Sequence, residues 1–516
     1  MTLNHGRTGH RGLMDTPRSQ FHEGRFGRLF RNLQPFTPDD ADLIDLAETI
    51  IEQPVNVTDT EAASNIQQNL SAGFTYLGQF IDHELTFDPV SQLDRINDPD
   101  ALRDFRTPRF DLDSVYGSGP DDQVFLYNEQ DRKHLLFDET NSDLQRNARG
   151  TAIIGDPRND EHAILANMQL AFIKYHNSVV DELGGAGTFD TANRTVRFHY
   201  QWLVVNDFLT RVVGKDLVDE ILVPVRNPQT GAIIQWNGNL RFFQPRKRPF
   251  MPVEFSVAAY RFAHSMVRFG YSLNRLSDPE DTPGASVLPI FDIGSSPVRD
   301  LRGGRPFDAE RRVAWFRFFD FPEVTDPDQQ QKRQAARAID TQLSHGLGGL
   351  TPSVGAAPTG PISLAERNLR RGKALGLPTG QDVARAMGVP ESLIISSSNP
   401  DFPFSIGTGY DNDSSVPTID DAVRTRLTKI FADTTPLWYY ILKEAELIQN
   451  GQLLGPVGGR IVAEVFIGLL LGDSQSYLVA QPGFQPQASR FGAPADGQFG
   501  IVDLIRRAVT DPLTNN

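Results

Sequence analysis

Apolar residues recur at spacings of three and four over several stretches of the chain, the periodicity of helices with one buried face. The clearest stretch is 161–183, where the apolar stripe consists of Leu165, Met168, Phe172, Tyr175 and Val179. Helices are also expected from Pro38 onward and over about 195–213, 253–269, 363–375 and 458–471, and over 435–451, where Pro436 stands near the start and Gly451 at the end. Strand patterns are few, with short strands or turns expected at 124–127 and 134–137. The chain is therefore predicted to be mainly α, a single large helical domain with long loops and few short strands.

The chain has two parts of unequal length, a short one without clear periodicity and a long one with predicted helices. Residues 1–35 are basic, Gly-rich and weakly periodic, and we expect them to form an arm on the surface of a body made by residues 36–516. The stretch 253–269 is apolar on nearly every side, which places it in the middle of that body. The segments 275–310 and 346–361 are rich in Gly, Pro and Ser and predict long loops.

Composition narrows the class of protein. The 516 residues carry a formal charge of -15 without a long basic run, so nucleic acid is not expected as a partner. The chain has no cysteine, which excludes disulfides and thiolate metal sites. Its longest apolar run, 461–471, is shorter than the ~20 residues that a membrane span needs, and 1–20 lacks the apolar core of a signal peptide. We expect a soluble protein without a membrane span, cytoplasmic or secreted by a non-classical route.

Four stretches place polar residues in apolar surroundings. The first is 78–88, where His83 stands between Asp82 and Glu84. The second is 155–161, in which Arg158 and Glu161 lie three apart at a helix start. The others are Arg261 with His264, and Asn368 with Arg371. Each alone has a plain structural explanation, because a single histidine in a helix is more often a hydrogen-bonded core residue, and an Arg–Glu pair at spacing three is a common helix pair.

The combination indicates a specific chemistry. A histidine beside an arginine can cleave peroxide, because imidazole moves a proton between the two oxygens while guanidinium stabilises the developing charge. A second histidine on another buried helix can bind a haem iron from the opposite face. Its second ring nitrogen needs a partner, which Asn368 could supply. Without cysteine, haem held through histidine is the expected redox cofactor.

These motifs resemble those of the animal-type haem peroxidases, the peroxidase–cyclooxygenase superfamily, and the chain looks like a bacterial member. Gly-Gln-Phe-Ile-Asp-His-Glu is similar to the distal-histidine motif, Gly-Asp-Pro-Arg-Asn-Asp-Glu to the distal-arginine motif, and Arg-Phe-Ala-His-Ser to the proximal motif. Asn-Leu-Arg-Arg, followed by Gly-Leu-Pro, is similar to the segment that supports the proximal histidine. The resemblance runs from Phe26 to about Leu478, nearly the whole chain.

The resemblance implies a role for each matching residue. His83 would be the distal acid–base, with Arg158 and Gln79 beside it, and His264 would bind the iron of haem b with Asn368 as its partner. Arg261 and Arg371 would also contact the cofactor. Asp82 and Glu161 occupy the positions that form ester links to haem methyl groups. His162 stands where a methionine makes a sulfonium link in one mammalian member, so no such link is expected.

A fifth motif, residues 106–117, resembles the family's Ca²⁺ loop, and alternating oxygen donors in a short loop suit that ion. The resemblance implies that Ca²⁺ is bound by the residues Glu84, Thr107, Arg109 (through its carbonyl), Asp111 and Asp113. Glu84 and Asp113 stand where mammalian members have aspartate and serine. An acidic surface turn is the alternative interpretation.

The family contains several activities. The resemblance predicts a haem peroxidase that uses H₂O₂ to oxidise halides, pseudohalides or small phenolic or aromatic donors through a ferryl intermediate. A fatty-acid dioxygenase is the alternative, but its radical tyrosine lies three residues before the proximal histidine, where this chain has Arg261. Tyr260, one position earlier, would be rotated by ~100° on an α-helix. The third hypothesis is an adhesion module without catalysis, against which the joint presence of the site residues argues.

Overall fold

The computed structural model describes residues 26–52, 66–86, 108–140, 142–245, 250–278, 280–282, 287–291, 299–350, 363–407, 420–488 and 490–509. Over these residues the chain is mainly helical with few short strands, which confirms the predicted fold class. The helices are α1 Asp40–Glu48, α2 Gly73–Leu85, α3 Asp113–Tyr116, α4 Ala163–Leu183, α5 Phe189–Leu203, α6 Thr210–Val213, α7 Lys215–Ile221, α8 Pro327–Gln331, α9 Leu364–Ala374, α10 Gly380–Met387, α11 Asp421–Phe431, α12 Leu437–Gln449, α13 Pro456–Gly472, α14 Tyr477–Ala480 and α15 Ile501–Ala508.

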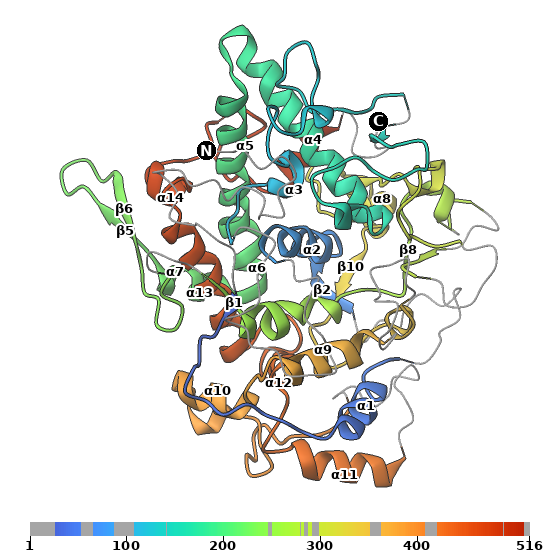
Figure 1. Cartoon of the computed structure of the whole chain (residues 1–516), viewed down its shortest axis with the longest axis vertical. Coiled ribbons are helices and arrows are strands. Elements are labelled where there is room, and N and C mark those ends of the chain that lie inside the picture. The colour runs from blue at the N-terminus through green and yellow to red at the C-terminus, as the bar shows by residue number, and fades with distance from the viewer. Residues whose placement is uncertain are drawn as a thin grey trace, which may run out of the picture.

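In the described part of the chain every sheet has two strands. The pairs are β1 Phe26–Gly27 with β7 Met251–Pro252, β2 Ile66–Ser71 with β10 Ala335–Arg337, β3 Phe137–Asp138 with β4 Asp143–Leu144, β5 Leu222–Arg226 with β6 Ile233–Gly238, and β8 Gly270–Tyr271 with β9 Leu288–Pro289. The β5–β6 hairpin projects from the body (Figure 1). Because two-stranded sheets are marginal on their own, the helices build the core, and its buried residues extend from Phe26 to Val509.

Helix α2 lies in the middle of the molecule (Figure 1), and 12 of its 13 residues are buried. It packs against α4 and against a 3₁₀ turn, η8 Ala259–His264. Phe80 of α2 stacks on Phe172 of α4 with ring centroids 4.4 Å apart. At the other end, a Cβ on Gly73 would come within 2.3 Å of the Phe319 ring, so this close approach requires glycine. Neighbours on several sides thus fix the helix that carries His83.

The predicted helix over 253–269 is wrong as a single α-helix. The segment forms a π-helical turn, η7 Glu254–Ala258, followed by η8, which ends at His264. The change of helix type falls at Ala258, whose backbone (φ -126°, ψ -72°) is not α-helical. Short π and 3₁₀ turns of this kind occur frequently at functional sites. The prediction that this segment is buried is confirmed.

The other predicted helices are present with shifted ends. The helix expected over 195–213 begins earlier, as α5, because Thr188 caps it by accepting the Thr191 N–H. It continues through a π-helical turn, η6 Val204–Leu209, into α6. Helix α4 follows the expected apolar stripe but starts at Ala163, after a 3₁₀ turn, η4 Pro157–Asp160.

Of the arm predicted for residues 1–35 only residues 26–35 are described, and the first of these are partly buried while residues 31, 32, 34 and 35 are exposed. Phe26 and Phe30 are buried, and Arg28 donates to the carbonyl oxygens of Leu375 and Gly376 at 2.6 and 2.8 Å. These contacts arise because the first described strand, β1, pairs with β7 next to η7.

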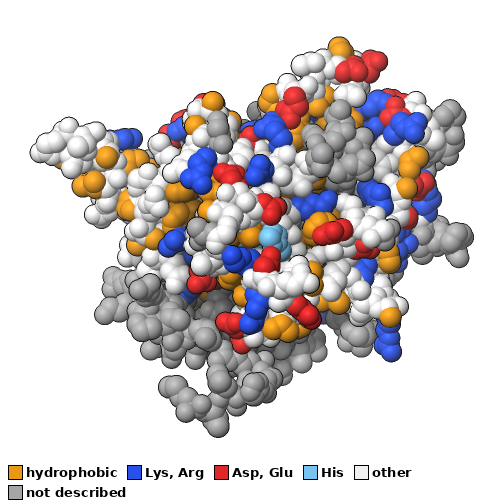
Figure 2. Space-filling view, turned by 90° about the horizontal axis from the view of Figure 1, so that it is seen from above, with side chains coloured by type: hydrophobic (Ala, Val, Ile, Leu, Met, Phe, Trp, Pro, Cys, Tyr) orange, Lys and Arg blue, Asp and Glu red, His pale blue; other side chains and the backbone are white. Residues whose placement is uncertain are grey.

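The surface carries charges of both signs. Figure 2 shows acidic and basic side chains mixed over one face, with apolar side chains on the projecting hairpin. Val223 and Ile234 of that hairpin are exposed. Within the described ranges no helix is long and apolar enough to cross a membrane.

Candidate active site

A cavity of about 960 Å³, including its mouth, lies between α2, η8, the start of α4 and the start of α9. It is lined by Thr75, Tyr76, Gly78, Gln79, Asp82, His83, Glu161, His162, Tyr260, Arg261, Ala263, His264, Val267, Ile290, Phe291, Leu347, Leu350, Leu364 and Arg367. Six residues predicted for the site are among them, although they come from three separate stretches of sequence. The combination of a largely apolar wall with a few convergent polar groups is typical of cofactor sites.

His83 is buried in the wall that α2 supplies. Its Nδ1 lies 2.7 Å from Oδ1 of Asn159, and the Asn159 amide nitrogen donates to Oε1 of Gln169 at 2.8 Å. Because Asn159 thus presents an acceptor to the ring, Nδ1 carries the proton and Nε2 keeps its lone pair. Burial, assisted by the charge of Arg158, lowers the pKa of His83 to about 4. The ring is therefore neutral at neutral pH.

Arg158 lies beside His83 without lining the cavity. Its guanidinium donates to the carbonyl oxygens of His83 and Thr86 at 2.9 and 2.8 Å, and it forms an ion pair with Asp156 at 2.8 Å. An arginine commonly binds the last carbonyl groups of a helix in this way. Arg158 therefore fixes the end of α2 and acts on the cavity through its charge.

Asp82 and Glu161 are the two carboxylates among the described residues that line the cavity. Asp82 accepts from the Thr86 hydroxyl at 3.0 Å and forms an ion pair with Arg261 at 3.3 Å. Glu161 accepts from the Gln79 amide nitrogen at 3.1 Å. Burial raises the pKa of Glu161 to about 7, against the opposing charge of Arg158.

His264 is the last residue of η8 and faces the same cavity. Its Nδ1 lies 2.8 Å from the side-chain amide nitrogen of Asn368 on α9, whereas the sequence predicted that Asn368 would present an acceptor to this ring nitrogen. For Nε2 to bind a metal, Nδ1 must carry the proton, so the Asn368 amide would have to present its oxygen instead. Burial, assisted by the charge of Arg261, lowers the pKa of His264 to about 3, which keeps the ring neutral.

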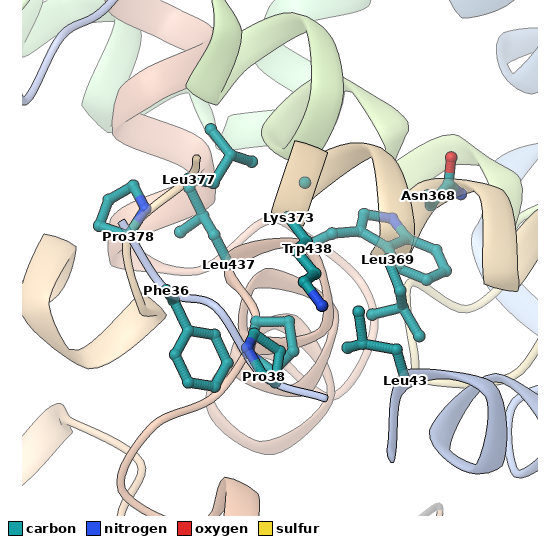
Figure 3. A pocket seen from close by; sticks show the side chains of 12 residues that line it. Phe36, Pro38, Leu43, Asn368, Leu369, Lys373, Leu377, Pro378, Leu437 and Trp438 are labelled. Atoms are coloured by element: carbon teal, nitrogen blue, oxygen red, sulfur yellow. The ribbon is translucent and has the colours of Figure 1, made fainter. Parts of the chain in front are cut away.

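A smaller pocket of about 320 Å³ lies between α9 and α12, and Figure 3 shows the side chains that line it. Asn368 and Trp438 are among the residues that line it. The Trp438 indole donates to the carbonyl oxygen of Arg261 at 3.2 Å. The segment that carries His264 is thus held from behind by α9 and α12.

The arginines near the cavity differ in part from expectation. Arg261 lines it, as predicted, and is fixed by a 2.8 Å hydrogen bond to the Ser256 carbonyl oxygen. The described lining does not include Arg371, whereas Arg367, one helical turn earlier on α9, is part of it. Helical periodicity puts both arginines on one face, and the sequence motif identified only the second.

Tyr260 lines the cavity, which contradicts the argument that its ring is turned away. That argument assumed an α-helix, and η8 is a 3₁₀ turn. The Tyr260 hydroxyl donates to the Gly78 carbonyl oxygen of α2 at 3.2 Å, and its ring stacks on Phe255 at 4.8 Å.

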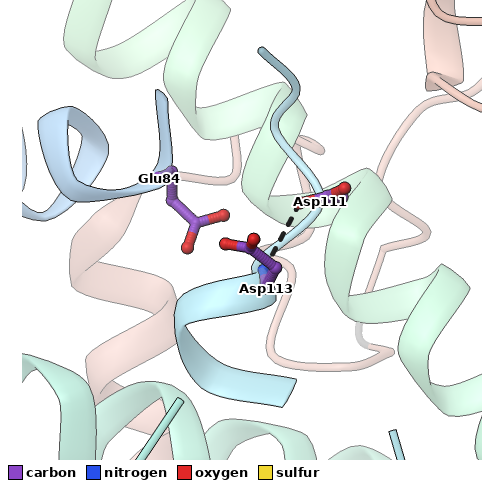
Figure 4. A group of neighbouring side chains, drawn as sticks. All are labelled: Glu84, Asp111 and Asp113. Carbon is purple, nitrogen blue, oxygen red and sulfur yellow. Dashed lines mark hydrogen bonds between the residues drawn. The ribbon is translucent and has the colours of Figure 1, made fainter. Parts of the chain in front are cut away.

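Three of the predicted calcium residues lie together, as Figure 4 shows. One oxygen each from Glu84, Asp111 and Asp113 lies within 4.8 Å of the others. Glu84 and Asp113 are buried, and such carboxylates repel one another unless a cation or protons lie between them. This donor set fits Ca²⁺. Thr107 lies outside the described residues, and Arg109 is buried beside the cluster.

The segment that carries Asp113 and Ser114 packs directly against the segment that carries Arg158. A Cβ on Gly155 would lie 2.3 Å from the Ser114 carbonyl oxygen, so the two loops come this close only with glycine. Ser114 N–H in turn donates to Glu84 at 2.9 Å. The carboxylate cluster and the wall of the cavity therefore share their supports.

Sequence reasoning missed three residues of the site: Asn159, His162 and Arg367. Asn159 follows Arg158 directly, in the motif already identified, so its position was the available signal. His162 was considered only as a replacement of methionine. In the structure His162 lines the cavity and bonds Gln79.

The geometry defines a class of site: one cavity with a neutral histidine on each of two walls, each ring held at Nδ1 by an amide side chain. This arrangement suits a metal-centred cofactor whose metal is bound by one histidine while the other histidine acts as an acid or base beside it.

Comparisons with known proteins agree with that class. The family model described as animal haem peroxidase matches residues 100–292, which include Arg158 and His264. Heme peroxidase 2 of Caenorhabditis elegans is 22% identical over 387 residues, 71% of this chain and 47% of that protein. The chain spans about half or less of the curated relatives it matches. Part of this chain is thus similar to animal haem peroxidases.

Solved structures show the same fold. Peroxidase A of Dictyostelium discoideum has a TM-score of 0.57 at 16% identity, covering 91% of each chain. The fatty acid alpha-dioxygenase of Arabidopsis thaliana has a TM-score of 0.59 at 15% identity, covering 95% of this chain and 78% of that one. At these identities the likeness concerns the fold alone. That the chain is a bacterial member stays a prediction.

Proposed function

We propose that this protein is a haem-dependent peroxidase that uses H₂O₂ to oxidise a halide, a pseudohalide or a small phenolic or aromatic donor. The observation that carries the proposal is the pair of neutral histidines on two walls of one cavity, His83 and His264, each fixed at Nδ1. His264 would hold the iron of haem b through Nε2. The haem would supply the electrons that cleave the peroxide bond.

His83 is suited to move the proton. Its Nε2 has a free lone pair and its ring is neutral, so it can accept a proton from one peroxide oxygen and return it to the other. Asn159 holds the ring in this tautomer. Arg158, whose charge already acts on His83, would stabilise negative charge as the bond breaks.

Asp82 and Glu161 line the cavity and would face the edge of the cofactor. We propose that each forms an ester with a haem methyl group. Each link would be oxidative: one C–H and one O–H bond would break, a C–O bond would form, and one H₂O₂ would be needed as the two-electron acceptor, giving two waters. Arg261 and Arg367, which are the basic residues of the described lining, would pair with the carboxylates of the cofactor.

The experiment compares two variants by absorption spectroscopy. His83→Ala should keep the haem band but react with peroxide slower by a factor of roughly 10² to 10⁴. His264→Ala should lose or loosen the haem. His199→Ala, which removes a buried histidine held by the Thr195 carbonyl oxygen, controls for general damage. Equal haem retention in the two site variants would contradict the assignment of sides, and a native chain without a peroxide-sensitive haem band would refute the function.

A fatty-acid dioxygenase is the second candidate, because Tyr260 lines the cavity. Oxygen uptake with a fatty acid, lost in Tyr260→Phe, would favour it. The hydroxyl of Tyr260 is engaged by Gly78, so we expect peroxidase activity to persist in that variant. A catalytically silent adhesion module would show neither activity.

A further inference from the structure

A chain of three hydrogen bonds runs along the cavity wall and ends at Glu161. The Leu165 N–H donates to Nδ1 of His162 at 3.3 Å, since His162 is the N-cap residue of α4. Nε2 of His162 lies 2.8 Å from Oε1 of Gln79. The Gln79 amide nitrogen then donates to Oε2 of Glu161 at 3.1 Å.

For each of these three hydrogen bonds the structure determines which group donates and which accepts. Nδ1 of His162 accepts a hydrogen bond and so carries no proton. Burial, with a smaller effect of His83, lowers the pKa of His162 to about 3, so the ring is neutral and its proton is on Nε2. Oε1 of Gln79 is therefore the acceptor, and its NH₂ group must face Glu161.

We propose that His162 is a positioning residue, which fixes the Gln79 amide so that its N–H holds the Glu161 carboxylate in one orientation at the cavity. The inference rests on the proposed function for what Glu161 does there, namely its attachment to the cofactor. The three hydrogen bonds involve only residues of the protein, so their effect on Glu161 can be measured whether or not the proposed function is correct. Gln79 is accordingly a bridge between His162 and Glu161.

A purely structural role for His162 would be the N-cap of α4, and this role uses only Nδ1. A cap needs only an acceptor such as Nδ1, so it requires neither the Nε2 proton nor an aromatic ring. The ring itself packs edge-on against Tyr76 with centroids 4.9 Å apart. Substitutions can therefore separate the two roles. His162→Phe keeps a ring but loses both hydrogen bonds. His162→Asn keeps a good cap but is too short to reach Gln79, whereas His162→Gln can reach it with an N–H.

The readout is the titration midpoint of Glu161, followed as the carboxyl C=O stretch by difference infrared spectroscopy on the full chain before any peroxide is added. Glu161→Gln identifies the band. The charged side chains acting on this group are Arg158, Asp156, Arg261 and Arg367, and all of the variants retain them.

In the native chain the midpoint should lie at about 7. Losing an N–H donor to the carboxylate should raise it by about one pKa unit. We expect this shift in His162→Phe, His162→Asn and Gln79→Leu, and a return toward the native value in His162→Gln. His199→Phe should leave the midpoint unchanged.

A native midpoint in His162→Phe, with a raised one in Gln79→Leu, would show that Gln79 holds Glu161 without help and would overturn the proposal. A native midpoint in His162→Asn would show that the cap alone suffices, which overturns it as well. A native midpoint in Gln79→Leu would remove its basis. Failure of the chain to bind haem would refute the proposed function and leave the Glu161 titration to decide the role of His162.

Discussion

Asp340 is a carboxyl group that the fold buries completely next to the segment that carries His264. Its Oδ1 accepts the Gln342 N–H at 2.9 Å, and its own N–H donates to the hydroxyl of Ser265, the residue after His264, at 3.4 Å. Its Oδ2 has no hydrogen-bond partner among the described residues. Burial raises the pKa of Asp340 to about 8, although the charge of Arg337 opposes it. We predict that Asp340→Asn changes how stability depends on pH.

The magnitude follows from proton linkage. In the unfolded chain an aspartate has a pKa of about 3.9, so between pH 4 and 8 the folded chain keeps a proton that the unfolded chain has released. Stability therefore falls as pH rises through this window, by about 1.4 kcal/mol per pH unit for this group. From pH 5 to pH 8 the loss amounts to about 4 kcal/mol. Asparagine has no such proton, so Asp340→Asn should gain about 4 kcal/mol relative to the native chain over the same interval.

The assay is urea unfolding, followed by circular dichroism and tryptophan fluorescence at pH 5, 6, 7 and 8. Any fixed cost of placing an NH₂ group at this site is the same at each pH and cancels in the comparison. Asp300→Asn is the matched control, because Asp300 is equally buried but paired with Arg302 and Arg305 at 2.5 and 3.1 Å. It should be less stable than the native chain at both ends of the range, since two guanidinium groups lose their acceptor.

A difference in unfolding free energy between Asp340→Asn and the native chain that stays constant within about 1 kcal/mol from pH 5 to pH 8 would refute the reasoning. It would mean that Asp340 is ionised in the folded chain, stabilised by its cationic neighbour more strongly than burial destabilises it. The direction of the change is decisive too. If Asp340→Asn gained stability relative to the native chain as pH falls, the pKa of Asp340 in the folded chain would have to be lowered instead of raised.

Three further predictions concern the site. Asn159→Leu should keep the haem band but slow the reaction with peroxide by about tenfold or more, since the His83 ring loses its fixed tautomer; a native rate in stopped-flow absorption would contradict this. Removal of Ca²⁺ by a chelator should lower the melting temperature of the native chain by several degrees, and Glu84→Gln should abolish the chelator effect; equal shifts in both proteins would disprove the role of the cluster. After peroxide treatment, Asp82→Asn should retain haem through acid extraction by its Glu161 link alone, as peptide mapping would show; haem released completely by extraction would argue against that link.

The helices over 161–183 and 435–451 are predicted best, and they form α4 and α12 within a few residues of the expected ends. The first carries apolar residues at spacings of three and four, and the second is bounded by Pro436 and Gly451. The segment 253–269 failed because it is apolar all round, so its pattern holds no information on the helix type. The close packing of η7 and η8 against α9, α12 and α13 decides that geometry.

The candidate site could also be predicted from the sequence only in part. Motif spacing identified His83, Glu161 and His264 because each lies in a short conspicuous segment. The atoms that fix these side chains come from residues far away in sequence, such as Gln79, which lies 82 positions before Glu161. A motif states which residue types are present, whereas which end of an amide faces which ring is decided by packing. The guanidinium of Arg158 is the clearest example, since its bonds to two backbone carbonyl groups leave no trace in the sequence.

Three consecutive residues of α2 illustrate how one rigid element joins separate sites. Successive side chains on a helix point ~100° apart, so Asp82, His83 and Glu84 reach three different neighbours. Asp82 meets Arg261 of η8, His83 meets Asn159, and Glu84 accepts the N–H of Ser114. The three side chains share one backbone, so a displacement of α2 at any one of them reaches the other two. Loss of the carboxylate cluster around Glu84 should therefore act on the peroxide chemistry of His83 even though no cation would touch the cavity, and the tightly buried α2 is the element that transmits the effect.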